Sequence, residues 1–217
     1  KLGLNCLILL KNDDSSNEIM KSIHFKDLDR IDYFKKLSGY DTLRQVLSNK
    51  VVLVEGPSDE LIFQKAYMKN NKNRLPIEDE IEIFSVGTGS LNFLEIAKKL
   101  NQKTIVLIDN DGNPERINEK FKDYINNEKI WIFYENETTQ TSDIVDFNYN
   151  TLEPYLLKCN NREKLNKILS KNYNNDEELL KYMKSNKTSV ALSIFETNED
   201  IIFPNYILDS VKKINEE

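Results

Sequence analysis

The segment VVLVEGPSDE (residues 51–60) begins with four apolar residues, as a buried strand does, and continues directly into an acidic turn. Its first four residues are apolar without alternation, which is typical of a strand in a parallel sheet covered on both faces. Glu55 follows at once, Gly56-Pro57 ends the strand, and Asp59 falls in the first turn of the helix expected next. A carboxylate at this point either marks where the strand reaches solvent or is a functional group that the strand positions.

The rest of the first two thirds of the chain alternates predicted strands and helices. Apolar runs predict three further strands at residues 81–86, 104–108 and 130–134, and helical spacing predicts helices between them, the last over 114–125. Strands joined by single helices imply right-handed crossovers and a parallel sheet. After residue 150 only helical patterns follow. The sequence therefore predicts an α/β fold with a parallel sheet of about four strands flanked by helices, followed by a C-terminal helical extension.

The N-terminal part has a different pattern. CLILL (residues 6–10) could form a strand, and residues 32–47 suggest a helix-turn-helix-like lead-in. We predict three parts, residues 1–49, 50–150 and 151–217. Because the sequence starts at Lys1 rather than at Met, we expect it to be a piece of a longer chain.

Composition excludes several classes of site. The chain has 217 residues, 39% hydrophobic and 30% charged, with no apolar run long enough to span a membrane. A single histidine, His24, argues against histidine-based zinc sites and Ser-His-Asp chemistry. Cys6 and Cys159 are far apart without metal-ligand spacing, so we expect a reducing cytoplasm.

Charge is distributed unevenly along the chain. The net charge is −6, yet residues 158–187 hold eight basic and four acidic side chains, so this segment carries +4 and the remainder −10. A basic tract beside an acidic core suits a protein that contacts phosphates while it holds a cation. A solvated helix face is the alternative explanation of such a tract.

Acidic residues follow two of the predicted strands. Asp109 and Asp111 come directly after the third strand, as Glu55 comes after the first. Ligands of open parallel sheets bind beyond the carboxyl ends of the strands, so the carboxylates converge if these two strands are neighbours. Oxygen ligands without His or Cys are those that Mg²⁺ or Mn²⁺ prefers, and we expect one or two ions. Asp-x-Asp-Gly alone also occurs as an ordinary turn.

Three segments together resemble a known domain. KVVLVEGPSDELIF (50–63), FSVGTGSLNFLEIA (84–97) and IVLIDNDGN (105–113) look like a TOPRIM domain, the metal-dependent fold of topoisomerases, primases and nucleases. Residues 33–50, TLEPYLL (151–157) and NKTSVALSIFE (186–196) narrow the resemblance to OLD-family (overcoming lysogenisation defect) ATP-dependent endonucleases, which are related to the anti-phage Gabija and retron effectors.

The resemblance implies roles for individual residues. Metal ligands are implied at Glu55, Asp59, Asp109, Asp111 and, less specifically, Glu153. The implied catalytic residues are Glu55, Asp109, Asp111 and Lys187, the last stabilising charge on the scissile phosphate. For nucleic-acid contacts we predict Arg162, Lys164, Lys167, Lys171, Lys184 and Lys187. Asn113 stands where topoisomerase-type TOPRIM domains often carry a third acid, which weakens a strand-passage function.

The resemblance implies an Mg²⁺- or Mn²⁺-dependent endonuclease of anti-phage defence that nicks or cuts DNA, with RNA left open as a substrate. No nucleotide-binding loop occurs here, so an ATPase domain, preceding residues 1–49 or on a partner chain, is the expected source of ATP dependence. We also expect a homo-oligomer in the full-length protein and no membrane contact. Two alternatives remain: a TOPRIM primase or topoisomerase fragment, and an inactive TOPRIM module that docks partners or senses nucleic acid.

Overall fold

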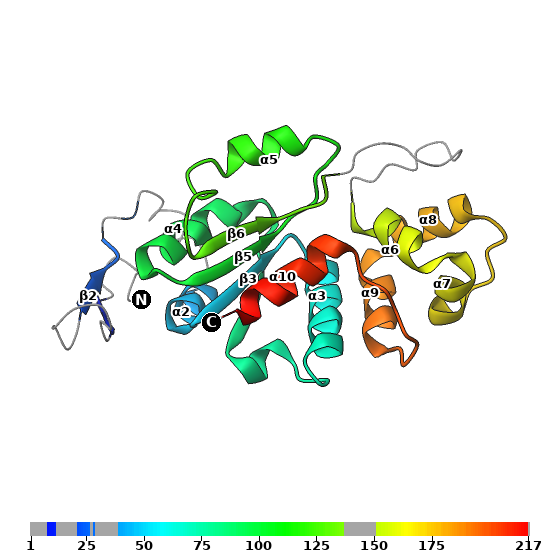
Figure 1. The fold of residues 1–217 in the computed structure, drawn as a ribbon, viewed down its shortest axis with the longest axis horizontal. Helices are drawn as coiled ribbons and strands as arrows, with labels where there is room; N and C mark the ends of the chain where they lie inside the picture. The colour runs from blue at the N-terminus through cyan, green and yellow to red at the C-terminus, as the bar shows by residue number, and fades with distance from the viewer. Residues whose placement is uncertain (1–7, 12–20, 27, 29–38, 137–150, 217) are drawn as a thin grey trace.

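Four parallel strands form the centre of the molecule (Figure 1). The computed structural model describes residues 8–11, 21–26, 28, 39–136 and 151–216. The strands are β3 (Lys50–Val54), β4 (Ile81–Ser85), β5 (Lys103–Leu107) and β6 (Ile130–Phe133), in the order β4-β3-β5-β6. Every neighbouring pair is parallel, and Leu53 lies opposite both Phe84 and Val106. The predicted α/β fold is confirmed, and β3 and β5 are the two central neighbours on which the predicted site depends.

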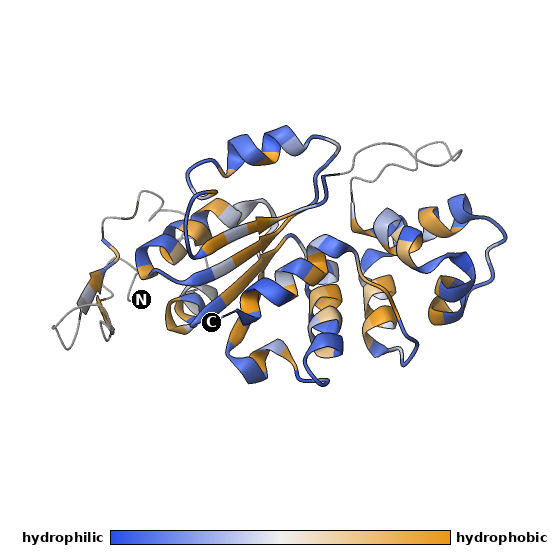
Figure 2. Ribbon diagram, in the orientation of Figure 1, coloured by the Kyte–Doolittle hydropathy of each residue, from blue (hydrophilic) through white to orange (hydrophobic). Residues whose placement is uncertain are grey.

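Helices cover both faces of the sheet, which explains the unbroken apolar run at residues 51–54. Val52 and Val54 pack in one hydrophobic core with α3 (Pro57–Asn70), α9 (Lys187–Glu196) and α10 (Asn205–Asn215). Val51 and Leu53 face the other core, beneath α4 (Ser90–Leu100) and α5 (Pro114–Lys120). All four residues are at most 1% exposed, and Figure 2 shows β3 as almost continuously hydrophobic. Their burial fixes the direction in which the strand delivers Glu55.

The helices after residue 150 share the core of the sheet. They are α6 (Leu152–Asn160), α7 (Arg162–Leu169) and α8 (Asp176–Ser185), followed by α9 and α10. Their apolar faces belong to the same cluster as Val52 and Ile105 of the sheet. The division at residue 150 stays a prediction, but the hydrophobic core crosses it.

The N-terminal part adds a small hairpin and one helix. Strands β1 (Ile8–Lys11) and β2 (Lys21–His24) pair antiparallel, and α2 (Gly39–Leu47) packs near α4 and β4. Of the predicted lead-in at residues 32–47, the part before residue 39 lies outside the described residues. No helix within the described ranges is long and apolar enough to cross a membrane.

The boundaries of several predicted elements are corrected. The fourth strand ends at Phe133 rather than at residue 134. The helix predicted over 114–125 ends at Lys120, because fully buried Phe121 turns the chain and its carbonyl accepts from Tyr124 N at 2.8 Å. The second strand ends at Ser85, before the 3-10 helix η3 (Gly87–Gly89). The third strand runs over 103–107 rather than 104–108, so Asp109 lies two residues beyond its end.

Candidate metal centre

Glu55 and Asp59 enter the site from the junction between β3 and α3. Glu55 follows β3 directly, and Pro57 begins α3 at a position where proline loses no helical hydrogen bond. Asp59 lies in the first turn, where its Oδ2 accepts from Gly56 N at 2.9 Å. This bond satisfies a backbone donor at the helix start and fixes the carboxylate close to the end of β3.

The loop after β5 presents Asp109 and Asp111 around a buried asparagine. Asn110 is 3% exposed; its Nδ2 donates to Glu135 O at 2.6 Å, and its Oδ1 accepts from Gly112 N at 2.8 Å. Asp111 (φ 48°) and Gly112 (φ 77°) both adopt left-handed backbone. The loop is thus held by its own hydrogen bonds, with Asp109 half-buried at its base and Asp111 exposed at its tip.

Asn113 caps the helix that follows this loop. Its Oδ1 accepts from Arg116 N at 3.1 Å, at the first turn of α5. Asparagine is among the best residues for this position. The residue that departs from the topoisomerase-type pattern therefore has a structural function here.

Glu153 and Lys187 meet across two helices that follow the sheet. Glu153 lies in the first turn of α6 with its side chain 4% exposed, and its Oε1 lies 3.4 Å from Lys187 Nζ. Thr151 Oγ1 donates to the other oxygen, Oε2, at 3.0 Å. Lys187 is the first residue of α9, an unfavourable end of a helix for a cation. Pairing with a buried carboxylate offsets that disadvantage.

Three of the predicted ligands line one narrow cleft. Glu55, Asp59 and Asp109 face it, and apolar or aromatic residues form the rest of its wall. These other residues are Leu107, Ile108, Leu152, Tyr206 and Ile207. The structure thus places three acids from the ends of β3 and β5 along one cleft, whereas Asp111 and Glu153 are not among the residues that line it.

Burial and mutual repulsion raise the pKa values of these acids. Burial, followed by the charges of Asp59 and Glu55, raises the pKa of Asp109 from 3.8 to about 8. Burial, Asp59 and Asp111 raise the pKa of Glu55 from 4.5 to about 7. Burial raises the pKa of Asp59 as well. Burial alone would lower the pKa of Lys187, but the carboxylates of Glu153, Asp109 and Asp59 outweigh it and raise that pKa. Like-charged groups so arranged attract cations.

The donor set fits a hard divalent cation by its chemistry. Carboxylate oxygens are the ligands of Mg²⁺ and Mn²⁺, and neither His nor Cys lines the cleft. Within the ranges that the structure describes, no three His, Cys, Asp or Glu side chains converge closely enough to hold an ion as they lie. A bound cation has to draw the carboxylates together against their repulsion.

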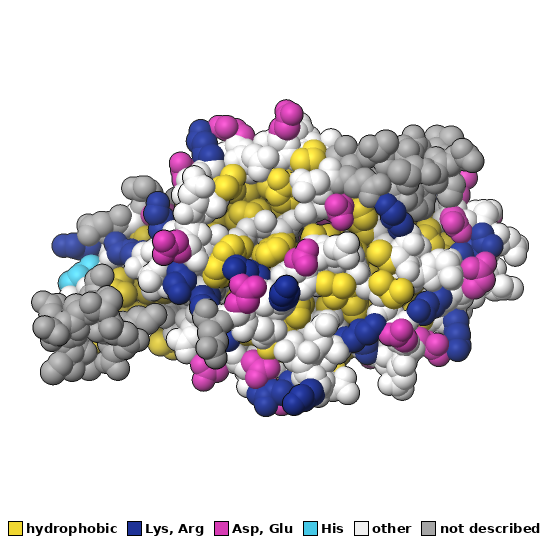
Figure 3. Space-filling view, in the orientation of Figure 1, with side chains coloured by type: hydrophobic (Ala, Val, Ile, Leu, Met, Phe, Trp, Pro, Cys, Tyr) yellow, Lys and Arg dark blue, Asp and Glu magenta, His cyan; other side chains and the backbone are white. Residues whose placement is uncertain are grey.

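Several residues of the predicted basic tract (residues 158–187) are already engaged in ion pairs or ring contacts within the protein. Arg162 pairs with Asp176 and Glu163, both at 3.1 Å, and Lys167 pairs with Glu199 at 2.8 Å. Lys171 lies over the Tyr182 ring, 4.9 Å from its centroid. Figure 3 shows basic and acidic side chains interspersed on the visible face of the molecule. Of the six residues predicted for nucleic-acid contact, all of which the structure describes, Lys187 is the one that interacts with the acids of the site.

The sequence analysis missed several residues of this region. Tyr206 of α10 lines the cleft, and burial followed by the charge of Asp109 raises its pKa well above the usual value. Lys120, at the end of α5, lowers the pKa of Glu55 and thus lies within electrostatic reach of it. Thr151 could have been found from its place two residues before Glu153. Nothing in the local sequence marks Tyr206 or Lys120, because tertiary packing alone brings them to the cleft.

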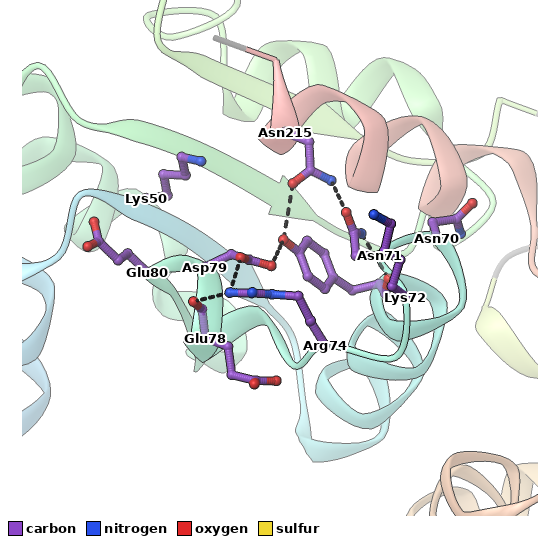
Figure 4. Close-up of a pocket in the computed structure, with 10 residues that line it drawn as sticks. Lys50, Asn70, Asn71, Lys72, Arg74, Glu78, Asp79, Glu80 and Asn215 are labelled. Atoms are coloured by element: carbon purple, nitrogen blue, oxygen red, sulfur yellow. Dashed lines mark hydrogen bonds and ion pairs between the residues drawn. The ribbon is translucent and has the colours of Figure 1, made fainter.

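A wider hollow lies at the amino ends of β3 and β4, away from the acidic cleft (Figure 4). It measures about 550 Å³ and is lined by polar groups around Tyr67. The Tyr67 hydroxyl donates to Asp79 Oδ2 at 2.8 Å and to Asn215 Oδ1 at 3.1 Å, and Arg74 pairs with Asp79 at 2.6 Å. These groups are paired with one another and connect the ends of α3 and α10, so the hollow is a structural junction.

The sheet order and the acids at the ends of β3 and β5 define the class of this protein as a TOPRIM domain. Within that class, residues 46–111 match the family described as overcoming lysogenization defect protein-like, TOPRIM domain. The chain therefore contains an OLD-like TOPRIM domain, and domains of this kind generally bind divalent metal ions.

Two solved structures share the fold over most of the chain. The C-terminal region of the Xanthomonas campestris pv. campestris OLD protein is 18% identical with a TM-score of 0.53, covering 77% of this chain and 95% of that one. The C-terminal region of the Burkholderia pseudomallei OLD protein is 17% identical with a TM-score of 0.56, covering 77% and 97%. No curated protein matches the sequence.

Proposed function

We propose that this chain is the nuclease part of an OLD-type protein of anti-phage defence, an Mg²⁺- or Mn²⁺-dependent endonuclease that hydrolyses DNA phosphodiester bonds. The observation that supports it best is the cleft in which Glu55, Asp59 and Asp109 meet at the ends of two neighbouring strands. Packing alone gives no reason to gather three carboxylates there, since their repulsion opposes folding.

Glu55, Asp59, Asp109 and Asp111 are the proposed ligands, with Glu153 at the margin of the site. One or two bound ions would supply an activated water and neutralise charge at the scissile phosphate. The ammonium of Lys187, held by Glu153 at 3.4 Å, is placed to meet negative charge that grows on the phosphate in the transition state. Lys187 is 46% exposed at its side chain, so a substrate can reach it.

DNA contacts are proposed along α7 and α8. Lys164 and Lys184 have no ion pair within the described residues and offer their charge directly. Arg162, Lys167 and Lys171 contact DNA only if a phosphate replaces Asp176, Glu199 or the Tyr182 ring. An ATPase domain and self-association of the full-length protein are part of the same proposal.

A plasmid-nicking assay tests the function. Supercoiled DNA is incubated with the protein and Mg²⁺, Mn²⁺ or EDTA, and we expect nicked or linear product with a metal and none with EDTA or with Asp109→Ala. Labelled RNA in parallel reactions distinguishes the substrate. Binding without cleavage under all metal conditions would favour the docking or sensing module instead.

A topoisomerase function predicts relaxed closed plasmid and a covalent tyrosine intermediate. Tyr206 is the tyrosine that lines the acidic cleft, and the burial and acidic neighbours that raise its pKa keep its hydroxyl protonated, which makes it a poor nucleophile. Hydrolysis by water is the reaction that this arrangement favours.

A further inference from the structure

Two lysines of α3 hold the chain segment that connects α9 to α10. Lys65 Nζ donates to Phe195 O at 2.8 Å and to Thr197 O at 2.7 Å. One turn further along α3, Lys69 Nζ donates to Ile201 O at 2.7 Å and pairs with Asp200 at 2.5 Å. Phe195 and Thr197 lie at the C-terminal end of α9, where helix carbonyls lack partners and the helix dipole favours a cation.

α3 and α9 lie side by side with the same direction (Figure 1). The two helices pack against each other in one hydrophobic core, and Lys187, the first residue of α9, lies beside Glu153. Lys65, in the middle of α3, reaches the end of α9. The contacts of Lys65 therefore fix how far α9 lies along α3.

That axial position decides whether Lys187 reaches the acidic cleft. The facing residues Ile62, Val190 and Ile194 are buried and apolar, and apolar contacts are not directional. A shift of α9 by one residue moves Lys187 by about 1.5 Å, and a shift by one turn moves it by about 5.4 Å. Either shift changes the 3.4 Å contact with Glu153, so hydrogen bonds at the far end of α9 secure the position of its first residue.

We propose that Lys65 is a positioning residue for Lys187, acting through the backbone of α9 over the length of that helix. Lys69 supports the same segment one turn further away. The proposal rests on the proposed nuclease function only where Lys187 is taken to act in cleavage; the placement of Lys187 can be measured without any activity.

The activity-free test is the rate at which Lys187 is acetylated, followed by peptide mass spectrometry. The ion pair with Glu153 protects the Lys187 amine, and exposed Lys181 serves as the internal reference. We expect Lys65→Met to speed acetylation of Lys187 several-fold relative to Lys181, Lys65→Arg to restore much of the protection, and Lys72→Met to change nothing. Lys72, exposed just beyond α3, is the matched control for loss of one positive charge. An unchanged Lys187 rate in folded Lys65→Met overturns the proposal.

A double-mutant cycle tests the route of action. Lys65→Met should lower kcat roughly tenfold or more, since misplacement of a catalytic group by about 1 Å can cost a hundredfold. KM and metal affinity should stay as in the wild type. The double variant Lys65→Met/Lys187→Ala should cleave as slowly as Lys187→Ala alone, because Lys65 acts only through Lys187. A double variant slower by the full product of both effects contradicts the proposal.

Two outcomes separate this inference from the proposed function. If the wild type does not cleave under any metal condition, the nuclease proposal fails and acetylation alone decides the role of Lys65. If Lys65→Met does not fold, Lys69→Met takes its place in both tests, with smaller shifts in the same direction expected. The proposal would then be overturned if Lys187 of Lys69→Met is acetylated at the wild-type rate and if the effects of Lys69→Met and Lys187→Ala on kcat multiply in the double variant.

Discussion

Glu55 and Asp109 are held by residues that cannot move freely. Val54 before Glu55 and Ile108 before Asp109 are 1% and 8% exposed, and each belongs to one of the two cores of the sheet. Close-packed interiors resist displacement, so the carboxylates stay near one another in spite of their repulsion. Their raised pKa values are the electrostatic cost of that placement.

Asp109→Ala should abolish metal binding in the cleft and reduce cleavage by a hundredfold or more. The reason is that one of the three carboxylates of the cleft is removed and the remaining acids repel one another less. Calorimetry with Mg²⁺ or Mn²⁺ measures the binding, and plasmid nicking measures the rate. Glu163→Ala, exposed on α7, is the control for loss of one carboxylate. Wild-type metal affinity in Asp109→Ala would place the ion elsewhere.

Lys187→Ala should separate binding from chemistry. A protonated lysine has no lone pair for a metal, so metal affinity should remain while cleavage falls about a hundredfold. Saturating metal should not restore the rate. Cleavage at the wild-type rate would show that Lys187 serves only to neutralise Glu153, which it approaches at 3.4 Å.

At the scale of elements, the local sequence was a good guide to the sheet and a poor guide to what surrounds the cleft. The unbroken apolar run of β3 and the acids after β3 and β5 predicted the site, because each strand end carries its own signal. Nothing in the local sequence shows that the side chain of Asn110 is buried and connects the loop to Glu135. Tyr206 and Lys120 come from helices whose approach depends on tertiary packing, which no local pattern encodes.

The basic tract illustrates a second limit of prediction from the sequence, because a count of charged residues does not show which of them form ion pairs in the fold. Lys164→Glu/Lys184→Glu should weaken DNA binding and flatten its dependence on salt by roughly two phosphate contacts, about 0.9 in the logarithmic slope for each. Both side chains lack an ion pair within the described residues, so folding should be unaffected. Fluorescence anisotropy at several salt concentrations measures the slope, with Lys72→Glu as control. An unchanged slope would show that Lys164 and Lys184 contact no DNA phosphate, and that α7 and α8 present only a solvated surface there.

At the scale of the whole molecule, the acidic cleft links stability to pH and to metal. The folded state holds protons on Asp109 and Glu55 with pKa values of about 8 and about 7, against 3.8 and 4.5 for free side chains. Between pH 5 and 8 the folded state therefore binds more protons than the unfolded state, and the contribution of these groups to stability falls as pH rises. Metal-free protein should lose stability over this window.

Divalent metal should reverse that loss. A ligand of the folded state at a hundred times its Kd stabilises by about 2.7 kcal/mol, which for a chain of this size raises Tm by roughly 5–10 °C. The shift should be larger at pH 8 than at pH 6, because the metal competes with protons for the same oxygens. Differential scanning calorimetry with Mg²⁺, Mn²⁺ or EDTA at both pH values measures it.

Asp109→Asn, which keeps the size of the side chain but not its charge, should be more stable than the wild type in EDTA and should gain little from metal. If instead the wild type melts at the same temperature with metal and with EDTA at pH 8, the cleft holds no cation.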